Sequence, residues 1–102
     1  MHVTEFCYQT YEIQGETVLA ICDADIAGRA FRQDDIVLDA KRSFYCSKEC
    51  GPIKAKRLFE QATIINATGV RAVALLVEQG LADKERVLVV EGVPHAQMVK
   101  LE

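Results

Sequence analysis

The sequence has no apolar run long enough to cross a membrane. Its longest run, residues 72–77, is far shorter than the roughly 20 residues that a spanning helix needs. The first residues lack a basic region followed by an apolar one, so we expect no secretory signal. We therefore expect a cytoplasmic protein that does not bind a membrane.

Signatures of known catalytic chemistry are also missing. The chain has no glycine-rich phosphate loop, no nucleophile elbow and no His-Glu-x-x-His motif. The acidic pair Asp34-Asp35 suits a turn better than a catalytic dyad. The net charge of −3 does not favour broad electrostatic binding to nucleic acid, although a local basic patch stays compatible with it. The absence of these motifs favours a protein that is not an enzyme and has no cofactor.

The patterns that are present predict one α+β domain over residues 1–102. At this length, with half of its residues hydrophobic, the chain can bury a core without further staples. We expect strands near residues 3–10, 17–22, 36–39, 87–90 and 95–101, the fourth buried and the last at an edge. Asp23 is expected to cap a short helical turn at residues 24–27.

Two helices complete this prediction. Pro52 suits a first helical position, and one apolar face follows it at Ala55, Leu58, Phe59, Ala62 and Ile65. Residues 66–69 then separate this helix from a second one, whose core stripe is Val70, Val73, Leu76 and Val77. We predict a two-layer domain of about five mostly antiparallel strands, with both helices packed on one face.

Cys46 and Cys50 are spaced so that they could share a metal ion. A tetrahedral set would need further ligands from Cys7, Cys22, His2 and His95. Structural zinc sites ordinarily use two Cys-x-x-Cys units, which this chain lacks. The alternatives are two loop cysteines with no joint role or a local disulfide. An ordinary disulfide framework is not expected without a secretory signal, except in hyperthermophiles. Cys7 and Cys22 lie in expected strands, where we expect burial.

A polar group of residues flanks the second helix and the last strand. Backbone N–H groups at the start of that helix can bind an anion, and Arg71 can contact phosphate or carboxylate with two hydrogen bonds. His95 titrates near neutrality. In the alternative interpretation, Asn66 or Thr68 only caps a helix, Arg71 pairs with Glu78 or Asp83, and His95 binds a backbone carbonyl. The candidate ligand-binding residues are Asn66, Arg71, His95 and Gln97.

One basic cluster stands out in this acidic chain. Lys54, Lys56 and Arg57 fall on the exposed side of the first helix, and three more cations precede them at Lys41, Arg42 and Lys48. Phe44 and Tyr45 lie between these cations in the sequence, which is compatible with stacking on single-stranded RNA. Because Asp39, Glu49 and Glu60 flank or interrupt the cluster, a solvated helix face explains it equally well.

Several stretches resemble one known family. They are Ile21-Cys22-Asp23 with Gly28 and Phe31, Phe44-Tyr45, Ala62-Thr63-Ile64 with Asn66 and Gly69, Arg71-Ala72-Val73, Gly80-Leu81, and Gly92-Val93-Pro94-His95-Ala96-Gln97. Together they resemble a small archaeal family known as domain of unknown function four-two-four. The resemblance implies an archaeal cytosolic protein with no assigned activity. The family pattern does not require Cys46 and Cys50, which leaves a metal there as a property of this member alone.

These observations favour a non-enzymatic binding module whose surface includes Asn66, Arg71, His95 and Gln97. RNA or a protein of the translation machinery is the partner class that we expect first. The alternative is a small metal- or thiol-dependent enzyme that uses His95 with nearby cysteines. A third hypothesis is a homodimer that pairs through the last strand, because an unpaired strand edge is a ready interface.

Overall fold

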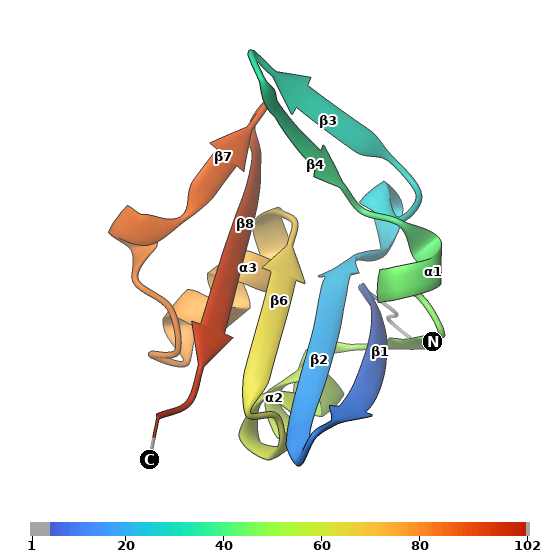
Figure 1. Ribbon diagram of the computed structural model, residues 1–102, viewed down its shortest axis with the longest axis vertical. Helices are drawn as coiled ribbons and strands as arrows, with labels where there is room; N and C mark the ends of the chain where they lie inside the picture. The colour runs from blue at the N-terminus through green and yellow to red at the C-terminus, as the bar shows by residue number, and fades with distance from the viewer. Residues whose placement is uncertain (1–4, 102) are drawn as a thin grey trace.

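The centre of the structure is a six-stranded sheet in the order β5-β1-β2-β6-β8-β7 (Figure 1). The computed structural model describes residues 5–101. The strands are β1 (Phe6–Ile13), β2 (Glu16–Asp23), β5 (Lys48–Cys50), β6 (Ile64–Thr68), β7 (Leu88–Val90) and β8 (Val93–Val99). All neighbours are antiparallel except β2 and β6. The predicted α+β class is confirmed, but the sheet contains two strands that were not predicted, β5 and β6, and the expected strand at residues 36–39 lies outside it.

Two helices, α2 (Pro52–Gln61) and α3 (Val70–Glu78), cover one face of the sheet, which we call the helix face (Figure 1). Pro52 stands in the first turn of α2, where its missing N–H costs nothing. The core between the layers includes Ile21 and Ile65 from the sheet and Phe59 and Leu76 from the helices, each at most 1% exposed. No helix among the described residues is long and apolar enough to cross a membrane.

The opposite side of the sheet, which we call the open face, is covered only in part. The hairpin of β3 (Ala30–Gln33) and β4 (Ile36–Asp39) packs Phe31 and Leu38 against Val90. The short helix α1 (Arg42–Tyr45) lies beside β1, and the one-turn helices η1 (Ala24–Ile26) and η2 (Lys84–Arg86) complete the elements. In Figure 1 the hairpin reaches past the end of the sheet toward β7. In the described part of the chain, no helix lies in front of β6 and β8 on this face.

The largest correction concerns the segment between the two helices. It is the central strand β6, and α2 ends at Gln61 rather than continuing through residue 65. Ala62 and Ile65 are both buried, but Ile65 is buried as a strand residue. The prediction of a longer helix was wrong because a short apolar run fits both the helical period and the strand period. Two isoleucines and a threonine among the five residues of β6 favour the extended conformation.

The roles of the last two strands are exchanged relative to the prediction. Strand β7 is at the sheet edge, with Leu88 41% and Val89 52% exposed, whereas β8 lies inside the sheet. Strand β8 belongs there because alternate residues, Ala96 and Met98, enter the core. Because β7 already pairs with residues 93–95, a second copy that paired through the last strand would be limited to the residues beyond them. On the side of β8 that faces β7, residues 96–99 have no strand partner among the described residues.

Candidate functional site

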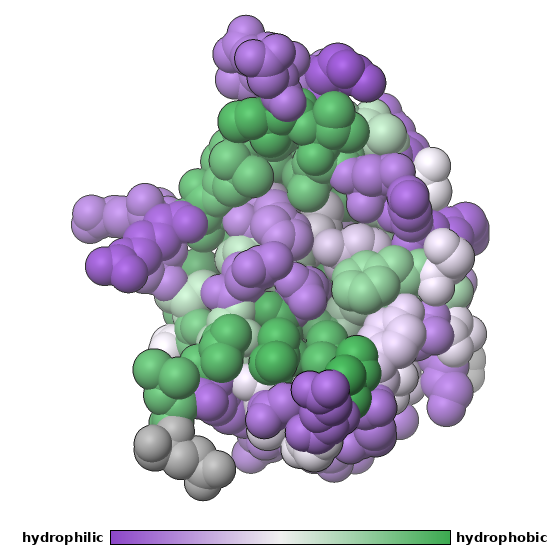
Figure 2. Space-filling view, viewed as in Figure 1, coloured by the Kyte–Doolittle hydropathy of each residue, from purple (hydrophilic) through white to green (hydrophobic). Residues whose placement is uncertain are grey.

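Three of the four predicted ligand-binding residues lie together on the open face. Asn66 stands opposite Gln97 in the β6–β8 ladder, and Thr68 stands opposite His95. Directly paired residues in neighbouring strands point to the same side of a sheet, so these four side chains form one group, which we call the polar patch. The sequence predicts Asn66 between two helices, whereas it lies in β6, while His95 and Gln97 lie in β8, within the expected last strand. Figure 2 shows a hydrophilic band across the middle of this face, between apolar areas.

An aromatic pair lies on the same face of the sheet, with β2 between its strand β1 and the patch strand β6. The rings of Tyr11 in β1 and Phe44 in α1 are stacked, with centroids 5.4 Å apart and planes 17° apart. The hydroxyl of Tyr11 also donates a hydrogen bond of 2.8 Å to the backbone carbonyl of Phe44. These contacts fix the orientation of the pair on the open face. Phe44 remains 37% exposed, so its ring is available for contact.

Hydrogen bonds hold one side of the polar patch rigid. The Thr68 hydroxyl donates to the Tyr45 oxygen at 3.0 Å and lies 2.8 Å from Nδ1 of His95. Because a hydroxyl has one proton, this assignment makes Nδ1–H of His95 the donor to Thr68. Burial lowers the pKa of His95 and raises the pKa of Tyr45. The histidine is thus neutral near pH 7, with Nε2 as an acceptor.

The lowered pKa of His95 predicts how stability depends on pH. In the unfolded chain histidine has a pKa near 6.5, so below that pH the unfolded state binds a proton that the folded state does not. The contribution of His95 is therefore fully present above about pH 6.5 and declines as the pH falls toward the folded pKa. Urea unfolding of the wild type and of His95→Gln, measured from pH 7.5 to pH 6, checks this. Equal slopes in the two proteins would contradict it.

Arg71, the fourth predicted ligand-binding residue, is not part of the polar patch. It lies at the start of α3, where its guanidinium is 3.5 Å from a carboxylate oxygen of Asp25 and 3.9 Å from one of Asp23. The backbone N–H groups of Arg71 and Ala72 donate to the Asp23 carboxylate at 3.0 and 2.8 Å. The predicted anion position is therefore filled by the chain's own carboxylate, and the arginine pairs with neither Glu78 nor Asp83.

This use of Asp23 corrects its predicted role as the cap of the helical turn that follows it. The side chain makes no capping hydrogen bond to η1 and instead joins the end of β2 to the start of α3. Burial raises the pKa of Asp23, against the two backbone hydrogen bonds that lower it. The neighbouring Gly69 has a φ of +115°, and a Cβ there would overlap the carboxyl group. No sequence pattern signals a contact between residues so far apart in the chain.

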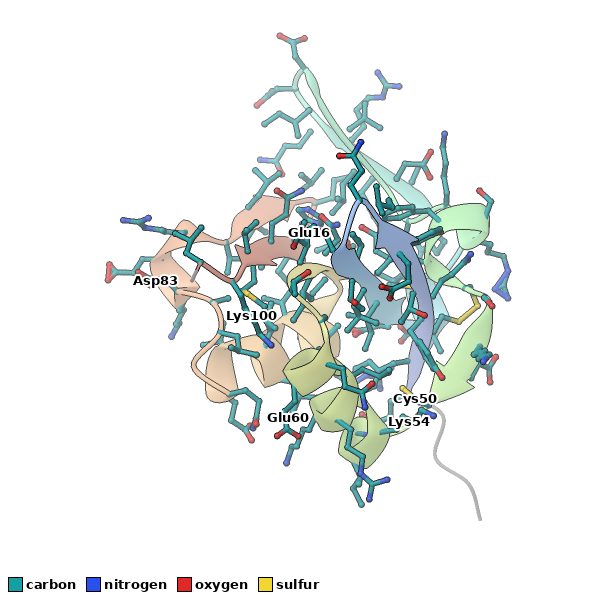
Figure 3. All side chains as sticks on the ribbon, turned by 60° about the horizontal axis from the view of Figure 1, so that its bottom comes forward. Glu16, Cys50, Lys54, Glu60, Asp83 and Lys100 are labelled. Atoms are coloured by element: carbon teal, nitrogen blue, oxygen red, sulfur yellow. A yellow bond between two sulfur atoms is a disulfide. The ribbon has the colours of Figure 1, made fainter. Side chains whose placement is uncertain are left out.

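The predicted nucleic-acid-binding residues Lys54, Lys56 and Arg57 lie exposed on α2, on the other side of the sheet from the polar patch. The expected aromatic partners are elsewhere, because Phe44 stacks on Tyr11 and Tyr45 is buried. Figure 3 shows Lys54 near Cys50, and Lys100 near the end of α2 that carries Glu60. The Lys100 ammonium donates to the carbonyls of Phe59 and Glu60, as suits a cation at a helix C-terminus.

Of the alternatives that the spacing left open for Cys46 and Cys50, the part of the chain that the structure describes shows neither a shared metal site nor a disulfide between the two. Cys46 is bonded to Cys7 in a disulfide whose Cα atoms are 4.7 Å apart, while Cys50 enters the core on the helix face. Cys22 and Cys50 are free and buried, and burial raises their pKa to about 12 and about 11. Both are therefore protonated thiols, which are poor nucleophiles and poor metal ligands. Within residues 5–101, no three metal-ligating side chains cluster together. The geometry thus gives no support to a thiol enzyme built on His95.

Comparisons with known proteins agree with the resemblance that the sequence shows. A family model described as a protein of unknown function (DUF424) matches residues 11–101. The crystal structure of an uncharacterized conserved protein from Methanopyrus kandleri is similar to this chain. It has 29% sequence identity and a TM-score of 0.78, and the match covers 95% of this chain and 94% of that one. A comparison with curated proteins gives no match. The chain therefore belongs to the DUF424 family.

Proposed function

We propose that this protein is a non-enzymatic module that binds single-stranded RNA on its open face. The observation that carries the proposal is the pairing of Asn66 with Gln97 beside Thr68 and His95, on the open face of β6 and β8, where no described helix lies in front of these strands. Side-chain amides carry both donors and acceptors and therefore match the edges of unpaired bases. The Tyr11–Phe44 pair, on the same face and across β2 from the polar patch, supplies an aromatic surface for stacking.

The charges of the open face suit contact with bases more than with phosphates. The polar patch contains no carboxylate. Two exposed cations, Lys41 and Arg42, lie at the start of α1. Neutralising two phosphates of a single strand gives a slope of about −1.4 in a plot of log affinity against log salt. The proposal therefore predicts binding that depends only weakly on salt, in contrast to a mode that uses a larger basic surface.

The test measures fluorescence anisotropy of labelled RNA with two variants that alter opposite sides of the sheet. We expect Asn66→Ala/Gln97→Ala to weaken binding of a short single strand by about tenfold or more, since two hydrogen-bonding groups are lost. The matched control, Lys54→Glu/Arg57→Glu on α2, should change affinity by less than about threefold, because its contribution is only long-range. Circular dichroism checks that both variants fold.

Three results would contradict this proposal. The first is no binding of single-stranded RNA at low salt by the wild type. The second is a larger loss in the Lys54→Glu/Arg57→Glu variant, which would move the RNA site to α2. The third is equal affinity for duplex and single strand, because a paired base cannot present its edge to Asn66 and Gln97.

A further inference from the structure

A groove on the helix face lies between α3 and the edge strand β7. Its volume is about 480 Å³, and its walls are apolar, with Val70, Ala74 and Val77 on the side of α3 and Val89 on the side of β7. The charged residues in its lining are Glu78 and Lys84. The groove is distinct from the polar patch, which occupies the other side of the sheet.

Apolar residues on both walls of this groove are exposed. Val70, predicted in the core stripe, is 62% exposed, and Val89 across the groove is 52% exposed. Residues 70, 74 and 77 share one side of α3 because their spacing follows the helical period. The core takes the other side, through Ala72, Val73 and Leu76. A contiguous apolar surface of this kind marks a contact with another molecule.

We propose that the groove binds a second copy of this chain, with the twofold axis running along it. In that arrangement α3 of each copy lies against η2 and β7 of the other, so that the exposed Val70 and Val89 cover each other. The two grooves close into one apolar interface, as a twofold contact requires the same surface from both copies. Strand β7 has three residues, so the apolar face rather than backbone pairing carries the contact.

The charges in the groove favour a second copy over other occupants. Glu78 stands on the α3 wall and Lys84 on the η2 wall, and neither forms an ion pair within residues 5–101. Because the twofold axis exchanges the two walls, Glu78 of each copy meets Lys84 of the other. A surface that carries one charge of each sign is complementary to itself, whereas a membrane or a nucleic acid would select cations alone.

Sedimentation velocity over a wide concentration range tests the dimer with variants that reverse the charges of Glu78 and Lys84, singly and together. The wild type should reach the mass of two chains, and Glu78→Lys and Lys84→Glu should each raise the dissociation constant about tenfold or more. The double variant Glu78→Lys/Lys84→Glu should return to within about threefold of the wild type, because it restores both opposite-charge pairs.

Two substitutions of exposed apolar residues complete the test. Val89→Lys should leave a single chain at all concentrations, whereas Ile53→Lys on α2, where the side chain is 71% exposed, should leave the dimer intact. A wild type that stays at the mass of one chain up to millimolar concentration would overturn the proposal. So would a double variant as weak as the single ones, since the charged residues would then not face each other.

Discussion

Gly69→Ala is expected to lower the free energy of unfolding by about 4 kcal/mol, among the largest effects of any single substitution in this chain. The residue has a φ of +115°, which costs an L side chain about 1–3 kcal/mol. Its added Cβ would also lie 2.7 Å from one carboxylate oxygen of Asp23, too close for any non-bonded contact. Asp23 cannot move away freely, because its carboxylate binds the backbone of Arg71 and Ala72.

A matched control separates backbone strain from steric overlap. Gly80 also has a positive φ, +75°, but a Cβ there meets nothing within 4 Å. Gly80→Ala should therefore cost only about 1 kcal/mol, measured by urea unfolding. Asp23→Ala/Gly69→Ala should cost less than the sum of its two single substitutions, because the overlap is gone. Equal losses in Gly69→Ala and Gly80→Ala would show that the contact with Asp23 does not matter.

Removing the disulfide is expected to cost about as much. Cys7 and Cys46 are 39 residues apart, and closing a loop of that length restricts the unfolded chain by about 4 kcal/mol in the loop-entropy model. Cys7→Ala/Cys46→Ala should therefore unfold at a lower urea concentration than the wild type. The bond also joins β1 to the end of α1, so its loss should loosen the Tyr11–Phe44 pair, visible in the near-ultraviolet circular dichroism.

Thiol counting gives the control for this prediction. In denaturant without reductant, two of the four cysteines should react, and all four should react after reduction. Cys50→Ala, which removes a buried but free thiol, should cost far less than the double variant because it leaves the loop closed. Four reactive thiols before reduction would contradict the bond between Cys7 and Cys46.

The sequence predicted the fold class and both long helices because their signals are local. Pro52 begins α2, and apolar residues at helical spacing bury one side of each helix. Strand β6 was missed because Ile65 extends the apolar spacing of the preceding helix. The order of strands in the sheet depends on contacts between distant segments, and no local pattern distinguishes the edge strand β7 from the inner strand β8.

In the candidate site, too, local features could be predicted from the sequence, whereas contacts between distant segments could not. Asn66, His95 and Gln97 stood out because polar residues interrupt apolar stretches, and pairing of β6 with β8 brings them together. Arg71 was predicted as an anion-binding residue at a helix start, but the anions that it contacts are the chain's own Asp23 and Asp25. The link that Thr68 makes between Tyr45 and His95 was not predictable, because such a network requires the register of two strands.

Titration of isotope-labelled protein with a short single-stranded RNA, followed by nuclear magnetic resonance, tests the central proposal most directly. The account predicts that the side-chain amide signals of Asn66 and Gln97 and the ring signals of His95 shift together and saturate, while the backbone signals of Lys54, Lys56 and Arg57 stay in place. Unchanged signals in the polar patch, or shifts confined to α2, would contradict it.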